Sequence, residues 1–319
     1  MVQKIILDMD PGIDDALAII LALRSPELQV EAITTVSGNV HVDQASKNAL
    51  KIVENMPKLK KKPEVAKGLS KPLFRELTTA ESVHGKDGLG DSNLQEPKQP
   101  LSKKHAVDLL IEKALSSKEG ELTIVTTGPL SNLAFALLKA PRIAEYVGQL
   151  IMMGGAFGVT KYGFGNVTPV AEFNVYSDPE AAKIVLDSGL HVTAVGLDVT
   201  MDSSALMTQK EYEKIQSAET KSAELVTRIT RSHMASFGSL ALHDPMAVAI
   251  AIDPSLVTKK KYFVEVETRG EYTRGQTVAD KRENLPPQTV GARKPISVCT
   301  KVLGEKFIEL FMKRVVFQS

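Results

Sequence analysis

The sequence has no tryptophan and a single cysteine, Cys299, among its 319 residues. One cysteine excludes an intrachain disulfide framework and fits a reducing compartment. The longest apolar run, residues 16–23, is far too short to span a bilayer. The net charge of +1 gives no global basic field for a nucleic acid polymer. The first apolar strand begins almost at once, so we expect no signal peptide and a cytoplasmic protein with no membrane partner.

The distribution of apolar residues predicts the fold class. Short β-branched runs predict strands, and longer periodic segments between them predict helices. This alternation predicts an α/β protein with an open, mostly parallel central sheet and helices on both faces. With no internal repeat or convincing linker, we expect one domain over residues 1–319. The predicted strands are residues 5–7, 30–36, 122–127, 150–153, 192–195, 262–267 and 277–279, and the predicted helices are residues 16–23, 44–55, 105–116, 131–139, 178–188, 209–237 and 301–315.

Four aspartates follow the first predicted strand: Asp8, Asp10, Asp14 and Asp15. A Pro-Gly turn separates the first pair from the second, which opens a helix whose dipole favours acidic residues in its first turn. They therefore gather at the carboxyl end of a strand, where open α/β sheets bind ligands. Carboxylates so close together repel one another, and a hard divalent cation with oxygen ligands would offset that repulsion. The stretch predicts a metal or catalytic site.

Other interpretations of this stretch are weaker. Each aspartate taken alone would ordinarily be a solvated turn residue or a helix N-terminal acid. An EF-hand loop from Asp8 would need Gly and Glu where Ile13 and Ile19 stand. The Asp-x-Asp pair is also similar to that of the haloacid-dehalogenase phosphatases, but those enzymes carry Thr or Val where Gly12 stands.

Polar residues recur at later predicted strand ends. Asp10, Asp15 and Asp244 with a strand-end carbonyl would form an oxygen cage for Ca²⁺. Calcium is favoured over zinc because no Cys/His cluster has zinc-ligand spacing. A metal-bound water has a lowered pKa, and a neighbouring carboxylate can take its proton. His243, beside Asp244, would be placed to protonate a leaving group, although a core histidine bonded to the backbone is the ordinary alternative.

Amide and carboxylate side chains further along the chain are suited to holding the vicinal hydroxyls of a sugar: Asn39, Asn166, Glu172 and Asn174. Helix capping and turn formation are the alternative roles for the asparagines. Residues 69–100 have weak periodicity and many turn residues, which indicates a functional segment. We expect its histidine, His84, to belong to a mobile wall of the site, with an ordinary exposed histidine as the alternative.

Several motifs in order along the chain carry a resemblance to one family. They are Asp8-x-Asp10-Pro11-Gly12-x-Asp14-Asp15-Ala16, Ala32-Ile33-Thr34-Thr35-Val36-x-Gly38-Asn39, Thr127-Gly128-x-Leu130-x-Asn132, Met153-Gly154-Gly155, Pro169-Val170-Ala171-Glu172-Phe173-Asn174, Asp178-Pro179-Glu180-Ala181-Ala182, Val195-Gly196-Leu197-Asp198 and His243-Asp244-Pro245. The chain resembles the inosine–uridine-preferring nucleoside hydrolases over most of its length.

The resemblance implies an open α/β fold and hydrolysis of the N-glycosidic bond of ribonucleosides to ribose and free base. It also implies Ca²⁺ as cofactor and a homo-oligomer, dimer or tetramer, and it assigns roles by position. Metal ligands would be Asp10, Asp15, Asp244 and the Thr127 carbonyl; Asp10 would be the general base and His243 would assist base departure; Asp14, Asn39, Asn166, Glu172 and Asn174 would hold the ribose, with Met153 beneath it and His84 lining the base pocket.

The base preference and two other functions remain open. The family branch that stacks purines between tryptophans does not fit a chain without tryptophan. Residues 224–237 lack the tyrosine pair of the protozoan enzymes and have Thr227 and Arg231 at about those positions, which favours pyrimidine nucleosides. The alternatives are a metal-dependent phosphohydrolase, which would release phosphate, and a non-catalytic pentose or nucleoside binder, which would bind without turnover.

Overall fold

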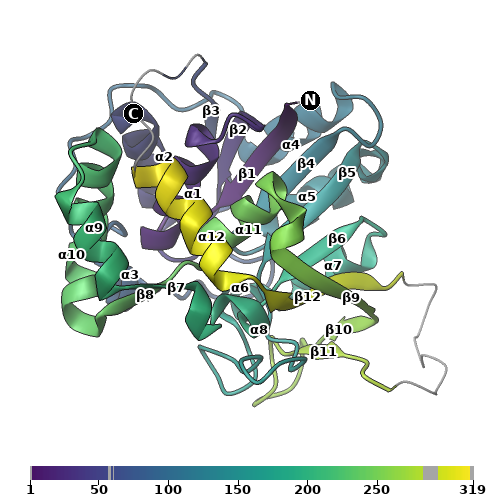
Figure 1. The fold of residues 1–319 in the computed structure, drawn as a ribbon. Helices are drawn as coiled ribbons and strands as arrows, with labels where there is room; N and C mark the ends of the chain where they lie inside the picture. Colours follow the sequence, from purple (N-terminus) through teal and green to yellow (C-terminus); the bar gives the residue numbers. More distant parts are fainter. Residues whose placement is uncertain (1, 57–58, 60, 283–293, 317–319) are drawn as a thin grey trace.

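An eight-stranded sheet forms the centre of the computed structural model, which describes residues 2–56, 59, 61–282 and 294–316 (Figure 1). Its spatial order is β3-β2-β1-β4-β5-β6-β12-β9, and every neighbouring pair is parallel except β12 and β9. The predicted open, mostly parallel sheet is confirmed. Its strands are β1 (Gln3–Met9), β2 (Leu28–Thr35), β3 (Glu64–Lys67), β4 (Leu122–Thr126), β5 (Val147–Met153), β6 (Val192–Val195), β9 (Val257–Tyr262) and β12 (Ile296–Val302). Two small antiparallel ribbons pair β7 (Leu206–Thr208) with β8 (Ser239–Ala241) and β10 (Val264–Val266) with β11 (Thr277–Ala279).

Helices cover both faces of the sheet, as predicted. Side chains alternate along β1, so that Ile5 and Leu7 enter one hydrophobic cluster and Ile6 enters the other. The first cluster includes α1, α2 and α9 to α12, and the second includes α4, α5 and α7. The helices are α1 (Ile13–Arg24), α2 (Val42–Asn55), α3 (Glu81–His84), α4 (Ala106–Leu115), α5 (Ser131–Lys139), α6 (Phe173–Ser177), α7 (Pro179–Asp187), α8 (Leu197–Thr200), α9 (Gln209–Ser217), α10 (Lys221–Phe237), α11 (His243–Ile252) and α12 (Gly304–Phe311).

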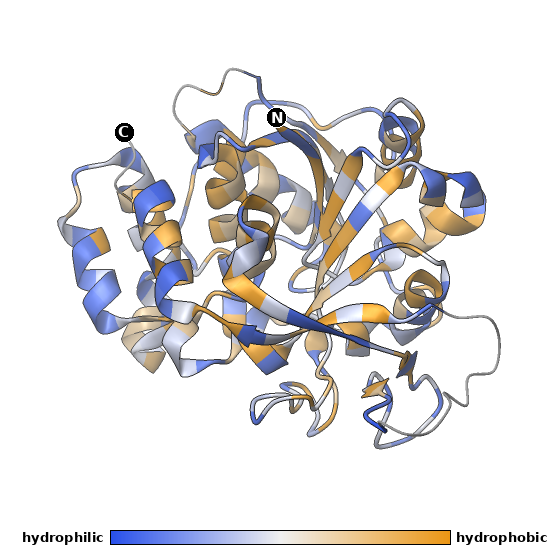
Figure 2. Ribbon diagram, turned by 45° about the vertical axis from the view of Figure 1, so that its right-hand side comes forward, coloured by the Kyte–Doolittle hydropathy of each residue, from blue (hydrophilic) through white to orange (hydrophobic). Residues whose placement is uncertain are grey.

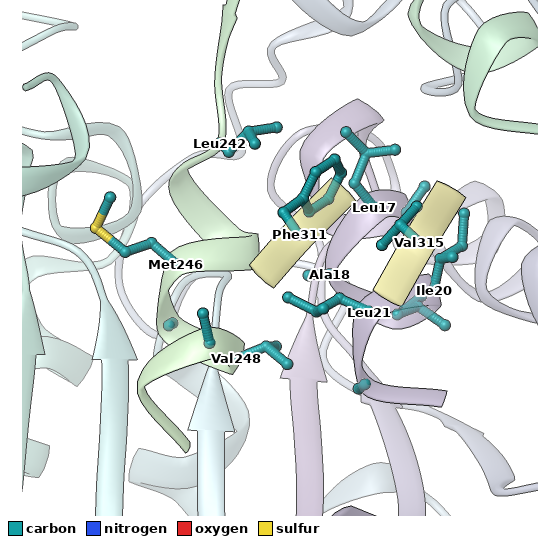
Figure 3. Packing of buried hydrophobic residues seen from close by; sticks show 14 of the residues in the cluster. Leu17, Ala18, Ile20, Leu21, Leu242, Met246, Val248, Phe311 and Val315 are labelled. Carbon is teal, nitrogen blue, oxygen red and sulfur yellow. The ribbon is translucent and has the colours of Figure 1, made fainter. Parts of the chain in front are cut away.

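The buried helix α1 positions the acidic motif. It is apolar on all sides after its two aspartates, which is typical of a helix enclosed by other elements. Figure 3 shows its Leu17 and Leu21 packed near Phe311 of α12 and beside α11, which carries Met246. Because α11 begins at His243, this packing brings Asp244 to the same edge of the sheet as the start of α1.

The sheet ends in a polar strand on the β9 side. Lys259, Lys260 and Lys261 are exposed along β9, which is hydrophilic in Figure 2. Charges on an edge strand oppose pairing with another chain's strand. Among the described residues, no helix combines the length and the apolar character that crossing a membrane requires.

Some sequence-based boundaries were wrong. The predicted helix over residues 301–315 begins only at Gly304, because Lys301 belongs to β12, a strand that the sequence did not reveal. The polar residues Thr300 and Lys301 conceal β12 by interrupting its apolar pattern. The short strand β3 was also missed, and the expected strand 262–267 is interrupted at Phe263. The helix expected over residues 209–237 is two helices, α9 and α10. The Thr220 hydroxyl caps the second of them by accepting a hydrogen bond from the Ala223 amide at 3.1 Å.

Candidate active site

The aspartates of the acidic motif lie together in the interior at the carboxyl end of β1. Asp10 follows β1, Asp14 and Asp15 open α1, and Asp244 stands at the start of α11. None of these four carboxylates is more than 7% exposed. Oxygen atoms of Asp14, Asp15 and Asp244 lie within 4.8 Å of one another. The sequence therefore predicted correctly that distant acidic residues share one edge of the sheet.

Neighbouring donors hold two of these carboxylates in place. Asp15 accepts hydrogen bonds from the Thr127 hydroxyl at 2.8 Å, the Gly12 amide at 2.9 Å and the Asn39 side-chain amide at 3.0 Å. Asp10 accepts one from the Asn39 backbone amide at 2.6 Å through Oδ2. Its other oxygen, Oδ1, is buried and has no hydrogen-bond partner among the described residues. An unpaired buried carboxylate oxygen is costly and requires a ligand or a proton.

The proximity and burial of these groups disfavour their negative charges. Burial, followed by repulsion from Asp15, raises the pKa of Asp10 well above its usual range. Burial and repulsion from the other three carboxylates do the same to the pKa of Asp244. For Asp14, burial followed by repulsion from Asp15 raises the pKa to about 7. Charges that repel one another in a dry site are stabilised together by a bound cation.

The residues present fit a hard divalent cation. The cluster itself offers carboxylate oxygens, and the buried Asp10 Oδ1, which has no hydrogen-bond partner among the described residues, is available as a ligand atom. The closest carboxylate group is Asp14, Asp15 and Asp244, rather than the predicted set in which Asp10 replaces Asp14. The predicted carbonyl of Thr127 lies beside Asp15 and already accepts a hydrogen bond from the Asn174 side chain at 2.7 Å.

The residues expected to hold a sugar also meet at this edge. Asn174 donates to the carbonyls of Thr127 and Met153, at 2.7 and 3.2 Å. Glu172 caps α6 by accepting from the Asn174 and Val175 amides, a role that the sequence had suggested only for asparagines, and it also accepts from the Gly155 amide at 2.9 Å. Burial raises the pKa of Glu172.

Asn166 is attached to the same group from a more exposed position. Its side-chain oxygen accepts a hydrogen bond from the Phe173 amide at 3.0 Å. The segment 157–160 that leads toward it is held by Asp198, whose carboxylate accepts hydrogen bonds from the amides of Phe157, Val159 and Thr160 at 2.8, 2.7 and 3.2 Å. The sequence did not suggest this anchoring role for Asp198.

Three histidines border the acidic cluster. The Ile13 amide donates to His84 Nδ1 at 3.1 Å, so the proton of a neutral His84 ring resides on Nε2. His243 Nδ1 lies 2.8 Å from the Thr200 hydroxyl. Burial lowers the pKa of both rings to about 4, with His233 contributing to each, so they are neutral at pH 7.

His84 therefore lies against the acidic motif rather than on the open surface. A Cβ at Gly12 would come within 2.5 Å of its ring, so only glycine permits this approach. His233, on α10, was missed because no pattern around it distinguishes it from an ordinary helix residue. Its Nδ1 is buried and has no hydrogen-bond partner among the described residues.

An open α/β sheet with buried carboxylates, amide side chains and histidines at its carboxyl edge has the features of a site that could hold a divalent cation. Residues 5–309 match the family model described as inosine-uridine preferring nucleoside hydrolase. The protein belongs to this family, whose members are metal-dependent hydrolases that act on the N-glycosyl bonds of nucleosides.

Comparison with individual proteins agrees with this assignment. The chain is 40% identical over 294 residues to an inosine-uridine preferring nucleoside hydrolase of Leishmania major, covering 90% of each chain. It is 38% identical over 328 residues to the pyrimidine-specific ribonucleoside hydrolase RihA of Salmonella schwarzengrund, covering all of both. Among solved structures, a plant nucleoside hydrolase superimposes with a TM-score of 0.90 at 36% identity, again covering all of both chains.

The raised pKa values predict that stability depends jointly on pH and on a divalent cation. Unfolded carboxyl groups titrate near pH 4, whereas the folded cluster titrates higher, with Asp14 near 7. Between these values the folded, metal-free protein binds more protons than the unfolded chain, so its stability falls as pH rises through that window. Ca²⁺ at pH 7.5 should therefore raise the melting temperature by about 5 °C or more, and less at pH 5, where protons compete.

Thermal unfolding with Ca²⁺ or with chelator at both pH values checks this expectation. Asp244→Asn should weaken the response to Ca²⁺ because it removes one of the clustered carboxylates. Melting temperatures that are identical with Ca²⁺ and with chelator at both pH values would contradict the metal site.

Proposed function

We propose that this protein is a calcium-dependent ribonucleoside hydrolase that converts a nucleoside and water into ribose and free base. The observation that carries the proposal is the buried carboxylate cluster with an unpaired Asp10 oxygen, in a chain of this family. Asp10, Asp15, Asp244 and the Thr127 carbonyl would hold Ca²⁺. When bound, the cation supplies positive charge that lowers the pKa of water and attracts the 2′- and 3′-hydroxyls of ribose.

The chain's own groups perform the proton transfers and hold the sugar. Asp10, which would also contribute a carboxylate oxygen to the metal site, accepts the proton of the attacking water as the water oxygen bonds to C1′. The N-glycosidic bond breaks through an oxocarbenium-like transition state, and its electron pair leaves with the base. Buried carboxylates stabilise the positive charge that develops on the ribose ring. The residues that hold the ribose are Asp14, Asn39, Asn166, Glu172 and Asn174, with Met153 beneath the ring.

Histidines act on the base side. His243, held by Thr200, donates a proton or a hydrogen bond to the departing base, and His84 lines the base pocket. Both rings are neutral at pH 7 because burial lowers their pKa to about 4, and His84 carries its proton on Nε2 because its Nδ1 accepts from the Ile13 amide. A neutral donor suits a dry site, where forming an imidazolium is costly.

We also propose a cytoplasmic homo-oligomer, dimer or tetramer, in which residues 1–319 act as one domain. The single cysteine, Cys299, is free and buried, and such sparse use of cysteine fits a reducing compartment. The oligomer follows from the family resemblance alone.

Replacement of the proposed base should stop turnover. Asp10→Asn preserves the shape of the side chain but cannot accept the proton, so we expect kcat to fall about 100-fold or more. Asp8→Asn is the matched control, at a buried position inside β1 two residues earlier. Asp8 Oδ1 accepts hydrogen bonds from Thr34 and Asn132, at 2.7 and 2.8 Å, and its Oδ2, like Asp10 Oδ1, has no hydrogen-bond partner among the described residues. Because Asp8 is not a proposed ligand or base, this variant should keep most of the activity. Wild-type ribose release by Asp10→Asn would refute the role of Asp10.

Loss of the histidine beside Asp244 should affect poor leaving groups most. His243→Ala should lower kcat/KM for uridine by about 100-fold, because an unprotonated base is a poor leaving group. The p-nitrophenyl riboside needs no such assistance and should lose far less. Equal losses on the two substrates would show that His243 does not assist base departure.

The base pocket favours pyrimidine nucleosides in our proposal. A relative at 38% identity is named pyrimidine-specific, and no tyrosine occurs on α10. Arg228 is not free for base recognition, because it donates to the carbonyls of Ser92 and Asn93 at 2.9 and 3.2 Å. We expect a higher kcat/KM for uridine than for inosine, and the reverse order would overturn this preference.

A further inference from the structure

A buried amide on α2 joins the acidic turn to the segment that follows His84, whose Asp87 carbonyl also accepts a hydrogen bond from Gln44 at 3.2 Å. Asn48, on α2, has no exposed surface. Its Nδ2 donates to the carbonyls of Pro11 at 2.9 Å and Asp87 at 2.8 Å, and its Oδ1 accepts from Gln44 at 2.8 Å. The two carbonyls belong to elements distant in sequence, so the hydrogen bonds tie residues 84–91 to the turn between β1 and α1.

The segment is shaped to fit this amide. The Asp87 carboxylate accepts from the amides of Leu89 and Asp91, at 2.7 and 2.9 Å, and forms a compact turn. Gly88 has a φ of +73°, and a Cβ there would lie 2.8 Å from Asn48 Nδ2. A side chain at position 88 would therefore be strained and would push against the Asn48 amide.

The same turn carries His84. The Gly90 amide donates to the His84 carbonyl at 2.8 Å, and the Ile13 amide donates to the His84 ring at 3.1 Å. Two sets of contacts therefore hold this segment against the start of α1. The Ile13 amide bonds to the His84 imidazole, and Asn48 bridges the Pro11 and Asp87 carbonyls. Loss of a buried donor that serves two carbonyls leaves polar groups unsatisfied.

We propose that Asn48 is a positioning residue that fixes His84 on the base side of the site. This inference rests on the proposed function, in which His84 lines the base pocket. Loss of the Asn48 hydrogen bonds shifts His84 relative to the leaving base, while the carboxylates and the ribose-binding amides keep their own partners.

A near-isosteric variant tests the proposal. Asn48→Asp replaces the donor by an oxygen that faces two carbonyl oxygens. We expect kcat/KM for uridine to fall about 10- to 100-fold, as a displacement of about 1 Å produces, and that for the p-nitrophenyl riboside to fall less than about threefold. Ser46→Ala is the matched control on α2, because the Ser46 hydroxyl is buried and bonded to Thr35 at 2.7 Å but does not contact the segment. It should lower the stability of the fold without changing the ratio of kcat/KM for uridine to kcat/KM for the p-nitrophenyl riboside.

A second variant approaches the same contact from the other side. Gly88→Ala leaves α2 intact and places a methyl group against the Asn48 amide. It should give the same selective loss on uridine. The positioning role is refuted if a folded variant of either kind lowers kcat/KM equally for uridine and the p-nitrophenyl riboside. It is also refuted if such a variant leaves both values unchanged.

Amide hydrogen exchange separates this proposal from the proposed function. Exchange at Gly88 and Gly90, whose amides bond to Gly85 and His84, should be faster in Asn48→Asp, with β4 unchanged. Faster exchange in a protein that hydrolyses no nucleoside would refute the proposed function but retain the Asn48 attachment. Unchanged exchange at these amides would refute the attachment itself.

Discussion

Mutual repulsion among buried carboxylates is the constraint on which the rest of this structure depends. Asp10, Asp14, Asp15 and Asp244 are drawn from three elements into one dry region at the end of β1. Burial raises the pKa of all four, and repulsion from neighbouring carboxylates adds to the rise for Asp10, Asp14 and Asp244. In the proposed mechanism, the negative potential that would bind a cation would also stabilise a ribose ring that becomes positive during bond cleavage.

The hydrophobic scaffold makes this arrangement possible. Helix α1 packs against α11, so the acidic residues at the starts of the two helices lie side by side. The surrounding apolar residues keep the local dielectric constant low, which strengthens the charge interactions in the site. The acidic cluster comes from strand ends and helix starts. In the proposed mechanism the base side is formed by His84, at the end of α3, and by His243, which is adjacent to Asp244 at the start of α11.

Much of the fold and the acidic cluster could be predicted from the sequence because local signals coincide. A buried-type strand, a Pro-Gly turn and a helix-opening Asp pair identify the β1–α1 unit. The motif His243-Asp244-Pro245 marked a candidate site, but the sequence did not predict that it opens helix α11. β12 escaped prediction because its buried positions are interrupted by Thr300 and Lys301. His233 and Asn48 escaped because their significance lies in contacts across the fold, which no local pattern encodes. The sequence also did not reveal that Asp14 lies in the closest carboxylate group or that Glu172 caps α6.

The most direct test of the account is ribose release from uridine and inosine by protein that has been treated with a chelator and then resupplied with Ca²⁺. We expect chelated protein to release almost no ribose from either nucleoside, and Ca²⁺ to restore release, because the buried carboxylates need a cation to hold the ribose hydroxyls and the water. Undiminished ribose release by metal-free protein would contradict the central role of the carboxylate cluster. Absence of release from both nucleosides with Ca²⁺ bound would contradict the proposed hydrolase activity on these substrates.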